Sequence, residues 1–298
     1  MTSHFLTGAE LSAANLAALL DRAAALKVTP HASRALDRRT VALIFEQPST
    51  RTRTSFEAGI AELGGHPMVL RRDELQLTRG ESVRDTALVL SRHVAAIGLR
   101  TGEEATLTEL AAHATVPVVN MLSPLHHPCQ ALADLLTLRE FLGSLAGRTV
   151  AYVGDGNNVA RSLAALGTLA GMEVRVAAPP GFQLEEGTGA VLLEDPGEAA
   201  AGADAVYTDV WVSMSDDAAT AEGRRAALAP YRLDDALLDR AAPGAFALHC
   251  LPAHPGEEIT ESVLYGARQR IWEQAENRRH AQKALLEWLV RRADTLEG

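Results

Sequence analysis

The chain has 298 residues, of which 47% are hydrophobic, and it carries a formal net charge of −10. This length fits one or two domains and favours two, and the apolar content is enough for a substantial core. An acidic chain without a basic block argues against nucleic acid as a partner, and no apolar run approaches the roughly 18 residues of a membrane helix.

The beginning of the chain and its cysteines indicate a cytoplasmic protein. Residues 1–5 lack the basic segment and the apolar core of a signal peptide. The only cysteines, Cys129 and Cys250, imply no disulfide framework. A reducing compartment fits both observations.

Short apolar runs alternate with amphipathic stretches in the first half of the chain. The expected strands are Val41–Phe45, Met68–Leu70, Ala95–Leu99 and Val116–Asn120, and the expected helices include Leu11–Lys27, Ser82–His93 and Leu107–His113. This alternation is typical of parallel βαβ units with helices on both faces of the sheet.

The most informative segment follows the first expected strand. A proline turn leads to Ser49 and Thr50, which open an amphipathic helix that runs to about Leu63. Ser49 is a good N-cap, and the free N–H groups and positive dipole end of such a helix favour an anion. Arg51 adds a planar guanidinium suited to phosphate. The alternative is an ordinary capped helix with solvated arginines.

Two further groups of polar residues follow expected strands in this half. Arg100 ends the run Ala95–Leu99, where active-site residues of open α/β sheets tend to lie. His127 and Gln130 are three apart and can share one helix face, from which both can donate to a carbonyl oxygen. Zinc is an alternative reading of the neighbouring His and Cys residues, but no second ligand pair lies at a suitable spacing.

The second half repeats the alternation. Its expected elements are the bridging helix Ala131–Leu142, the strands Thr149–Val153, Glu173–Ala177, Ala205–Thr208 and Ala245–Leu248, a short helix with loops in Gly187–Ala203, a polar lid-like excursion in Ser213–Ala229, and a final helix Glu276–Val290 that folds back on the first domain. We therefore predict two doubly wound parallel-sheet α/β domains joined by bridging helices. The expected domains are residues 1–135, completed by the C-terminal helix 279–298, and residues 136–278.

The strand ends of the second half carry their own polar residues. Gly154-Asp155-Gly156 resembles part of a dinucleotide-binding turn, but Val159 stands at the third glycine position, so the signal for NAD is weak. Asn158 can instead present its amide to a small ligand, although capping of the helix by Asn157 or Asn158 explains the spacing equally well.

A carboxylate and a cysteine end the later strands. Asp209, with the hydroxyl of Ser213 four residues on, suits a ligand ammonium. Cys250 ends the next strand, where a cysteine can be reactive, although most cysteines are inert core residues. The Leu251–Pro252 bond is a candidate cis peptide. Arg278 lies near the start of the final helix.

In this order, the motifs resemble ornithine carbamoyltransferases over nearly the whole chain. The resemblance is carried by Ser49-Thr50-Arg51-Thr52-Arg53, His127-Pro128-Cys129-Gln130, Asp209 with Ser213-Met214, and His249-Cys250-Leu251-Pro252. It implies one domain for carbamoyl phosphate and one for the amino acid, and assembly as trimers or multiples of trimers. Family members usually have glycine where Ser215 stands, lysine at Gln47 and often arginine at Pro255.

The resemblance implies specific contacts for both substrates. Carbamoyl phosphate would contact Ser49, Thr50, Arg51, Thr52, Arg100, His127, Gln130, Cys250, Leu251 and Arg278, with Gln76 lent to a neighbouring subunit's site. Ornithine would meet Asn158, Asp209, Ser213 and Met214, and Asn120 is a further candidate for contact with its carboxylate.

The implied reaction is attack of the δ-amine of ornithine on the carbamoyl carbon, which gives citrulline and phosphate and serves arginine metabolism. Donors from Arg100, His127 and Thr52 would stabilise the developing oxyanion. Cys250 and Asp209 are the candidates for orienting the amine and steering its proton. The implied reaction requires no cofactor, metal or covalent intermediate.

Three rival functions stay open at this point. A sibling carbamoyltransferase would use aspartate, putrescine or N-acetylornithine, and Asp209 with Ser213-Met214 favours ornithine. A nicotinamide-dependent dehydrogenase rests on Gly154-Asp155-Gly156. A ligand-sensing paralogue would bind carbamoyl phosphate without making citrulline.

Overall fold

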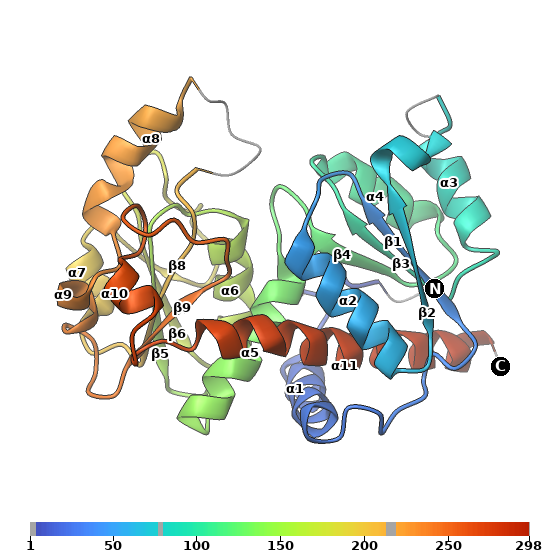
Figure 1. The fold of residues 1–298 in the computed structure, drawn as a ribbon, viewed down its shortest axis with the longest axis horizontal. Coiled ribbons are helices and arrows are strands. Elements are labelled where there is room, and N and C mark those ends of the chain that lie inside the picture. Colours follow the sequence, from blue (N-terminus) through green and yellow to red (C-terminus); the bar gives the residue numbers. More distant parts are fainter. Residues whose placement is uncertain (1–3, 77–79, 213–218, 298) are drawn as a thin grey trace. The chain divides into compact units, whose positions relative to one another are not determined.

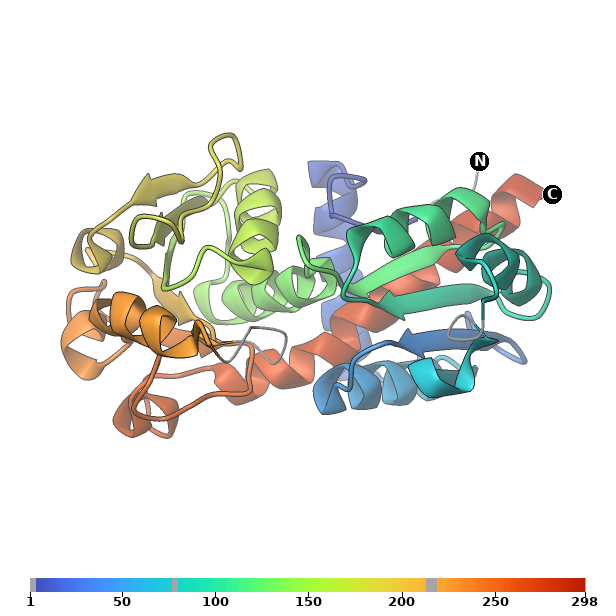
Figure 2. The ribbon, with the colours of Figure 1, turned by 90° about the horizontal axis from the view of Figure 1, so that it is seen from above.

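The computed structural model describes residues 4–76, 80–212 and 219–297. The chain forms two compact units, Met1–Ala133 with Glu276–Gly298 and Asp134–Ala275 (Figures 1 and 2). The chain passes between the units inside α5 (Pro128–Leu142) and α11 (Ile271–Glu297). Within the described part of the chain, no helix combines the length and apolar character needed to cross a bilayer.

The first unit is built on a four-stranded parallel sheet with the order β2-β1-β3-β4. The strands are β1 (Thr40–Phe45), β2 (His66–Arg71), β3 (Ala96–Arg100) and β4 (Val118–Leu122). The chain adds β2 on one side of β1 and then crosses to add β3 on the other side. This reversal makes the carboxyl ends of β1 and β3 a topological switch point, where open α/β sheets bind ligands.

Helices cover both faces of this sheet because the strands are buried on both sides. One face packs Ala42, Ile44 and Ile97 against apolar residues of α3 (Val83–Leu90) and α4 (Glu104–His113). The other face is tightly packed at Gly98, where an added Cβ would lie 2.8 Å from Met121 Sδ.

Three helices of the first unit are joined by close packing and ion pairs. α2 (Thr50–Glu62) approaches α11 so closely that a Cβ on Gly59 would lie 3.1 Å from Lys283 Cγ. Arg22 of α1 (Ala13–Val28) pairs with Glu287 of α11 at 2.8 Å. Arg278 lies on the same helix α11, and the packing of α11 against α1 and α2 fixes the position of its backbone beside α2.

The second unit has a five-stranded parallel sheet with the order β7-β6-β5-β8-β9. Its strands are β5 (Thr149–Val153), β6 (Glu173–Ala177), β7 (Val191–Leu193), β8 (Ala205–Thr208) and β9 (Phe246–His249), and its helices include α6 (Asn158–Leu169), α7 (Pro196–Ala200), α8 (Ala221–Leu228), α9 (Asp235–Leu238) and α10 (Glu261–Leu264). Here the strand order reverses between β5 and β8, which makes their carboxyl ends the second switch point.

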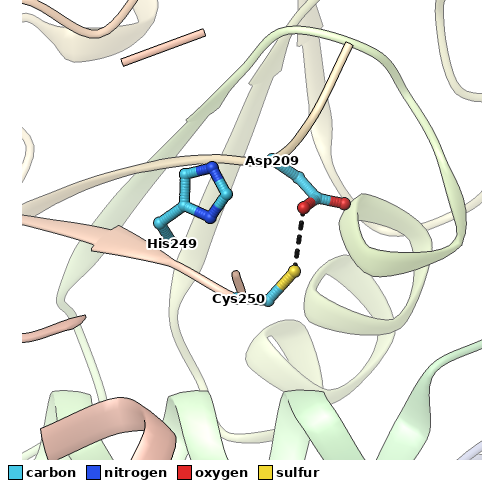
Figure 3. Close-up of side chains that lie close together, drawn as sticks. All are labelled: Asp209, His249 and Cys250. Atoms are coloured by element: carbon cyan, nitrogen blue, oxygen red, sulfur yellow. Dashed lines mark hydrogen bonds between the residues drawn. The ribbon is translucent and has the colours of Figure 1, made fainter. Parts of the chain in front are cut away.

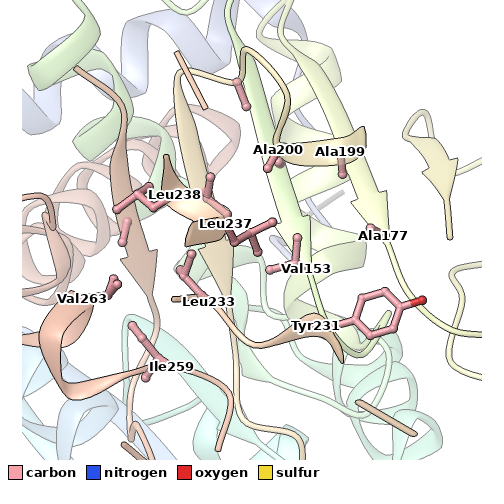
Figure 4. Packing of buried hydrophobic residues seen from close by; sticks show 14 of the residues in the cluster. Val153, Ala177, Ala199, Ala200, Tyr231, Leu233, Leu237, Leu238, Ile259 and Val263 are labelled. Carbon is pink, nitrogen blue, oxygen red and sulfur yellow. The ribbon is translucent and has the colours of Figure 1, made fainter. Parts of the chain in front are cut away.

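One core cluster of the second unit lies on a single face of its sheet (Figure 4). It packs Val153 and Ala247 of the strands against Ala199 of α7, Leu238 of α9 and Val263 of α10. On the same strands Tyr152 and Tyr207 are also fully buried, with ring centroids 5.5 Å apart. Burial on both faces keeps the strand ends rigid.

The fold class agrees with the prediction, but several elements differ from it. The segment Ser213–Ala229 was expected to be a polar excursion, but its described part contains the helix α8. The segment Gly187–Ala203 was expected to hold only a helix with loops, but it also contains the edge strand β7. Three residues are too few to show a period of two. α11 begins at Ile271 and extends to Glu297, beyond both ends of the expected helix, because its polar residues hide the apolar period outside Glu276–Val290.

Candidate active site

The first switch point brings two predicted residues together. Phe45 at the end of β1 pairs with Arg100 at the end of β3, and the next residue, Glu46, donates its N–H to the Arg100 carbonyl at 3.0 Å. The half-buried Arg100 therefore lies beside the loop that enters α2. The position of Arg100 at a strand end was predicted from the sequence.

Ser49 caps α2 as the sequence predicted. Its backbone is extended, with φ −157° and ψ 108°, and its Oγ accepts the Thr52 N–H at 3.3 Å. The same hydroxyl donates to Thr52 Oγ1 at 3.0 Å. The remaining N–H groups of the first helical turn and the positive dipole end face the loop, which favours a bound anion.

A buried arginine connects the helix start to α5. Arg278 donates through Nη2 to Thr52 Oγ1 at 2.8 Å and through Nη1 to Gln130 Oε1. All three residues are at most 3% exposed. A charge-assisted pair of donors from a single guanidinium fixes two side chains relative to each other, so Thr52 and Gln130 are preorganised by Arg278.

His127 lies in the same cationic surroundings. Burial, followed by the positive charges of Arg278, Arg100 and Arg51, holds the pKa of His127 well below its usual value. The imidazole is therefore neutral near pH 7, when it can donate a hydrogen bond without carrying charge.

The other predicted residues of this unit differ in exposure. Thr50 is exposed and Arg51 is half-buried at the start of α2, while Gln76 is exposed after the short 3₁₀ helix Arg72–Glu74. Asn120 is fully buried, and its amide donates to the Leu6 carbonyl at 2.8 Å and to the Ser123 hydroxyl. These contacts fasten the N-terminal segment to β4.

The second switch point joins a carboxylate, a thiol and an amide. Asp209 follows β8 and Cys250 follows β9, and the Cys250 thiol donates to Asp209 Oδ1 at 2.9 Å (Figure 3). Asn157 donates from Nδ2 to Asp209 Oδ2 at 2.9 Å. Both carboxylate oxygens of Asp209 are therefore oriented by neighbours.

Sequence reasoning missed Asn157 as a partner of Asp209. Its Oδ1 caps α6 by accepting the N–H groups of Val159 at 2.9 Å and Ala160 at 3.1 Å. Asn158, the predicted ligand residue, is the half-buried first residue of α6. The cap position was a visible signal, but its second contact depends on β8, which sequence spacing cannot place.

The backbone groups of the loop after β5 are used by contacts within the protein. A Cβ on Gly156 would lie 2.6 Å from the Phe182 carbonyl oxygen, so this glycine is required by close packing of two backbone segments. Two N–H groups at the start of α6 are already satisfied by Asn157. Both observations disfavour the dinucleotide-binding interpretation, which needs these groups for a pyrophosphate.

Leu251 has the left-handed backbone angle φ +60° and precedes the cis Leu251–Pro252 bond that the sequence predicted. Its N–H donates to His249 Nδ1 at 2.8 Å. Ser213 and Met214, predicted to contact ornithine, lie outside the described residues, as does Ser215.

Two groups of side chains in the described part of the chain have ligand atoms close enough for a metal ion: Asp209, His249 and Cys250, and His254, Glu257 and Glu258. In the first group, both ring nitrogens of His249 are used by Leu251 and Glu258. In the second group, Glu257 pairs with Arg225 at 3.0 Å. Both groups thus have protein partners for the atoms that a metal would need.

Comparison with known proteins agrees with this architecture. Residues 3–140 match the carbamoyl-phosphate-binding domain of aspartate/ornithine carbamoyltransferases, and residues 146–289 match their aspartate/ornithine-binding domain. The fold is thus that of a two-domain group-transfer enzyme. The chain belongs to the aspartate/ornithine carbamoyltransferase family.

Relatives of known name extend over nearly the whole chain. An ornithine carbamoyltransferase from Acidothermus cellulolyticus is 54% identical over 97% of both chains. An anabolic ornithine carbamoyltransferase from Pyrococcus furiosus is 48% identical and covers 86% of this chain and 85% of its own. The crystal structure of ornithine carbamoyltransferase from Thermus thermophilus is 45% identical, with TM-score 0.88, and covers 94% of this chain and 96% of its own.

Proposed function

We propose that the protein transfers the carbamoyl group of carbamoyl phosphate to the δ-amine of L-ornithine, giving L-citrulline and phosphate. The observation that carries the proposal is the buried bridge from Arg278 to Thr52 and Gln130 at the start of α2. An ordinary capped helix with solvated arginines needs no buried guanidinium that joins two side chains. It is the arrangement that a preformed site for a small dianion requires.

The residues proposed for carbamoyl phosphate are those that the sequence predicted. The proposed contacts are Ser49, Thr50, Arg51, Thr52, Arg100, His127, Gln130, Cys250, Leu251 and Arg278, and Gln76 would reach the site of a neighbouring subunit in a trimer or a multiple of trimers. We propose that the phosphate lies on the first turn of α2, where Arg51 supplies a charge that the helix dipole alone lacks.

The carbamoyl oxygen gains negative charge as the amine attacks. Arg100, His127 and the Thr52 hydroxyl are proposed to donate hydrogen bonds to it. Burial of Thr52 and His127 favours this role, because fixed donors in a poorly solvated site stabilise developing charge without reorganising. The C–O bond to phosphate then breaks, and phosphate leaves with the bonding electron pair into the positive surroundings of Arg51.

Ornithine is proposed to meet Asn158, Asp209, Ser213 and Met214 in the second unit. An alkylammonium has a pKa of about 10.4, so roughly one amine in a thousand is neutral at pH 7. The Cys250–Asp209 pair, linked at 2.9 Å, is proposed to orient the amine and accept its proton. We assign the catalytic roles to Arg100, His127 and Cys250.

The relatives favour ornithine over the sibling substrates. The three relatives described above, which are 45% to 54% identical to this chain, are ornithine carbamoyltransferases, and one of them is described as anabolic. We therefore place the reaction in the direction of arginine synthesis.

A colorimetric assay for the ureido group formed on the acceptor, with purified protein, tests the proposal directly, because citrulline and the carbamoylated sibling acceptors all carry this group. We expect product with carbamoyl phosphate and ornithine, and less than about one-hundredth of that rate with aspartate, putrescine or N-acetylornithine, because polar sites discriminate strongly against poorly paired groups. Equal or faster turnover with a sibling acceptor would reassign the substrate. Tight carbamoyl phosphate binding without turnover of any acceptor would indicate a ligand sensor.

A further inference from the structure

The turn after β9 holds an unusual backbone conformation. Leu251 has φ +60°, a region that residues with a Cβ disfavour, and it follows Cys250 directly. Such a conformation persists only when surrounding contacts impose it. The turn carries two groups of the proposed site, the Cys250 thiol and the Leu251 carbonyl, so whatever imposes its shape also places these groups.

The ring of His249 links the turn to Glu258. Its Nδ1 accepts the Leu251 N–H at 2.8 Å, and its Nε2 lies 3.1 Å from Glu258 Oε1. Because Nδ1 is an acceptor, the ring hydrogen belongs on Nε2, which donates to the carboxylate. The geometry thus determines one neutral tautomer, which acts as a rigid spacer between Glu258 and the Leu251 backbone.

Glu258 binds both ends of the segment 249–254. The same Oε1 also accepts the His254 N–H at 2.5 Å, so one carboxylate oxygen holds both sides of the segment from 249 to 254. Glu258 is itself fixed, because its carbonyl accepts the Leu233 N–H at 2.8 Å. The His249 backbone is held as well, by Gln274 Oε1 at 3.0 Å. Hydrogen bonds to an ionised carboxylate are stronger than neutral ones.

We propose that His249 and Glu258 are positioning residues for the transfer reaction. Their hydrogen-bond chain sets the Leu251 backbone and thereby directs the Cys250 thiol at Asp209 and places Leu251 for its proposed contact with carbamoyl phosphate. Both residues are at most 1% exposed, so they act through the turn and do not touch substrate. The inference rests on the proposed function for the part played by the turn in catalysis.

Two substitutions of His249 distinguish its contact with the Leu251 N–H from its contact with the Glu258 carboxylate. His249→Gln places an amide near the former Nε2, so it can still donate to Glu258 but leaves the Leu251 N–H without its acceptor. His249→Asn places a carbonyl near the former Nδ1, so it keeps the Leu251 contact and loses the Glu258 contact. We expect kcat/KM for ornithine to fall about 10- to 100-fold in His249→Gln and several-fold less in His249→Asn.

Alkylation of cysteine by iodoacetamide, followed by mass spectrometry, gives a second readout that needs no catalysis. The half-buried Cys250 should change its alkylation rate by about threefold or more in His249→Gln, because thiol reactivity follows local geometry. Cys129 is an internal reference, since burial raises its pKa to about 12 and keeps it unreactive. If the wild type makes no citrulline, the proposed function fails, and the alkylation rates still test the turn.

Glu258→Gln serves if His249→Gln does not fold, because it keeps the side-chain shape while removing the charge. We expect the same direction of change in both readouts, with a smaller amplitude. Circular dichroism and melting midpoints show which variants are folded. A folded His249→Gln or Glu258→Gln with a lower melting midpoint but wild-type kcat/KM and alkylation would overturn the proposal, because it would show a purely structural contact.

Discussion

The two strand-end sites are built in opposite ways. At the start of α2, a buried cation joins neutral side chains, as Arg278 bridges Thr52 and Gln130. At the ends of β8 and β9, a carboxylate is the central group, as Asp209 accepts hydrogen bonds from Cys250 and Asn157. The first site concentrates positive charge. The second site contains hydrogen-bond acceptors, the carboxylate oxygens of Asp209, and the thiol hydrogen of Cys250.

This contrast matches the two needs of carbamoyl transfer. The departing phosphate and the carbamoyl oxygen are negative, and fixed donors stabilise them best when no reorganisation is needed. The attacking amine must instead lose a proton and be oriented by its lone pair, which suits a carboxylate with a thiol beside it. Each site is therefore unsuited to the other's task, and substitutions should separate anion binding from amine handling.

Arg51→Ala should have the largest effect. We expect carbamoyl phosphate affinity to fall about 100- to 1,000-fold, since two charge-assisted hydrogen bonds to a phosphate are lost together. Isothermal titration calorimetry without ornithine measures this directly. Arg53→Ala is the matched control, because Arg53 lies on the same helix but is exposed and pairs with Glu57 at 3.0 Å.

The control should bind carbamoyl phosphate within about twofold of the wild type, because an exposed pair contributes little. Equal losses in both variants would mean that general positive charge, and not the cap of α2, attracts the ligand. An unchanged Kd in Arg51→Ala would remove this helix start from the site.

Cys250→Ala should have a smaller effect. Without the thiol, Asp209 Oδ1 loses its donor, and we expect kcat/KM for ornithine to fall about 10-fold. Cys250→Ser keeps a hydroxyl donor and should recover part of the loss. Steady-state kinetics of both variants checks this, and a wild-type value for Cys250→Ala would exclude the thiol from the mechanism.

The parts of the sites that local sequence determines were the predictable ones. Ser49 could be recognised as a cap because its partner, Thr52, is three residues away, and Arg100 because a strand end places it at the sheet edge. The partners of Arg278 lie 148 and 226 residues away, and the contact between His249 and Glu258 depends on a turn whose shape is set by tertiary packing. No period or motif encodes such distances.

The concentration of positive charge in the first unit also predicts an effect on stability, in place of activity. Burial, together with Lys283 and Arg279, lowers the pKa of His280 to about 4. In the unfolded chain a histidine has a pKa of about 6.5. Between these values only the unfolded state takes up the proton, so stability is fully present above about pH 6.5 and declines as the pH falls towards 4.

His280→Gln removes this proton uptake and should make the loss of stability between pH 6.5 and 4 shallower, by at most about 1.4 kcal/mol per pH unit. Urea unfolding at pH 7, 6 and 5 measures the slope, and His66→Gln, at an exposed histidine of β2, is the control. His127, whose pKa is also lowered by burial and arginines, adds to the same slope in wild type and variant alike. A parallel pH dependence of the free energy of unfolding in all three proteins would mean that the acid sensitivity arises from other groups. The positive charge around His280 would then have no measurable effect on stability.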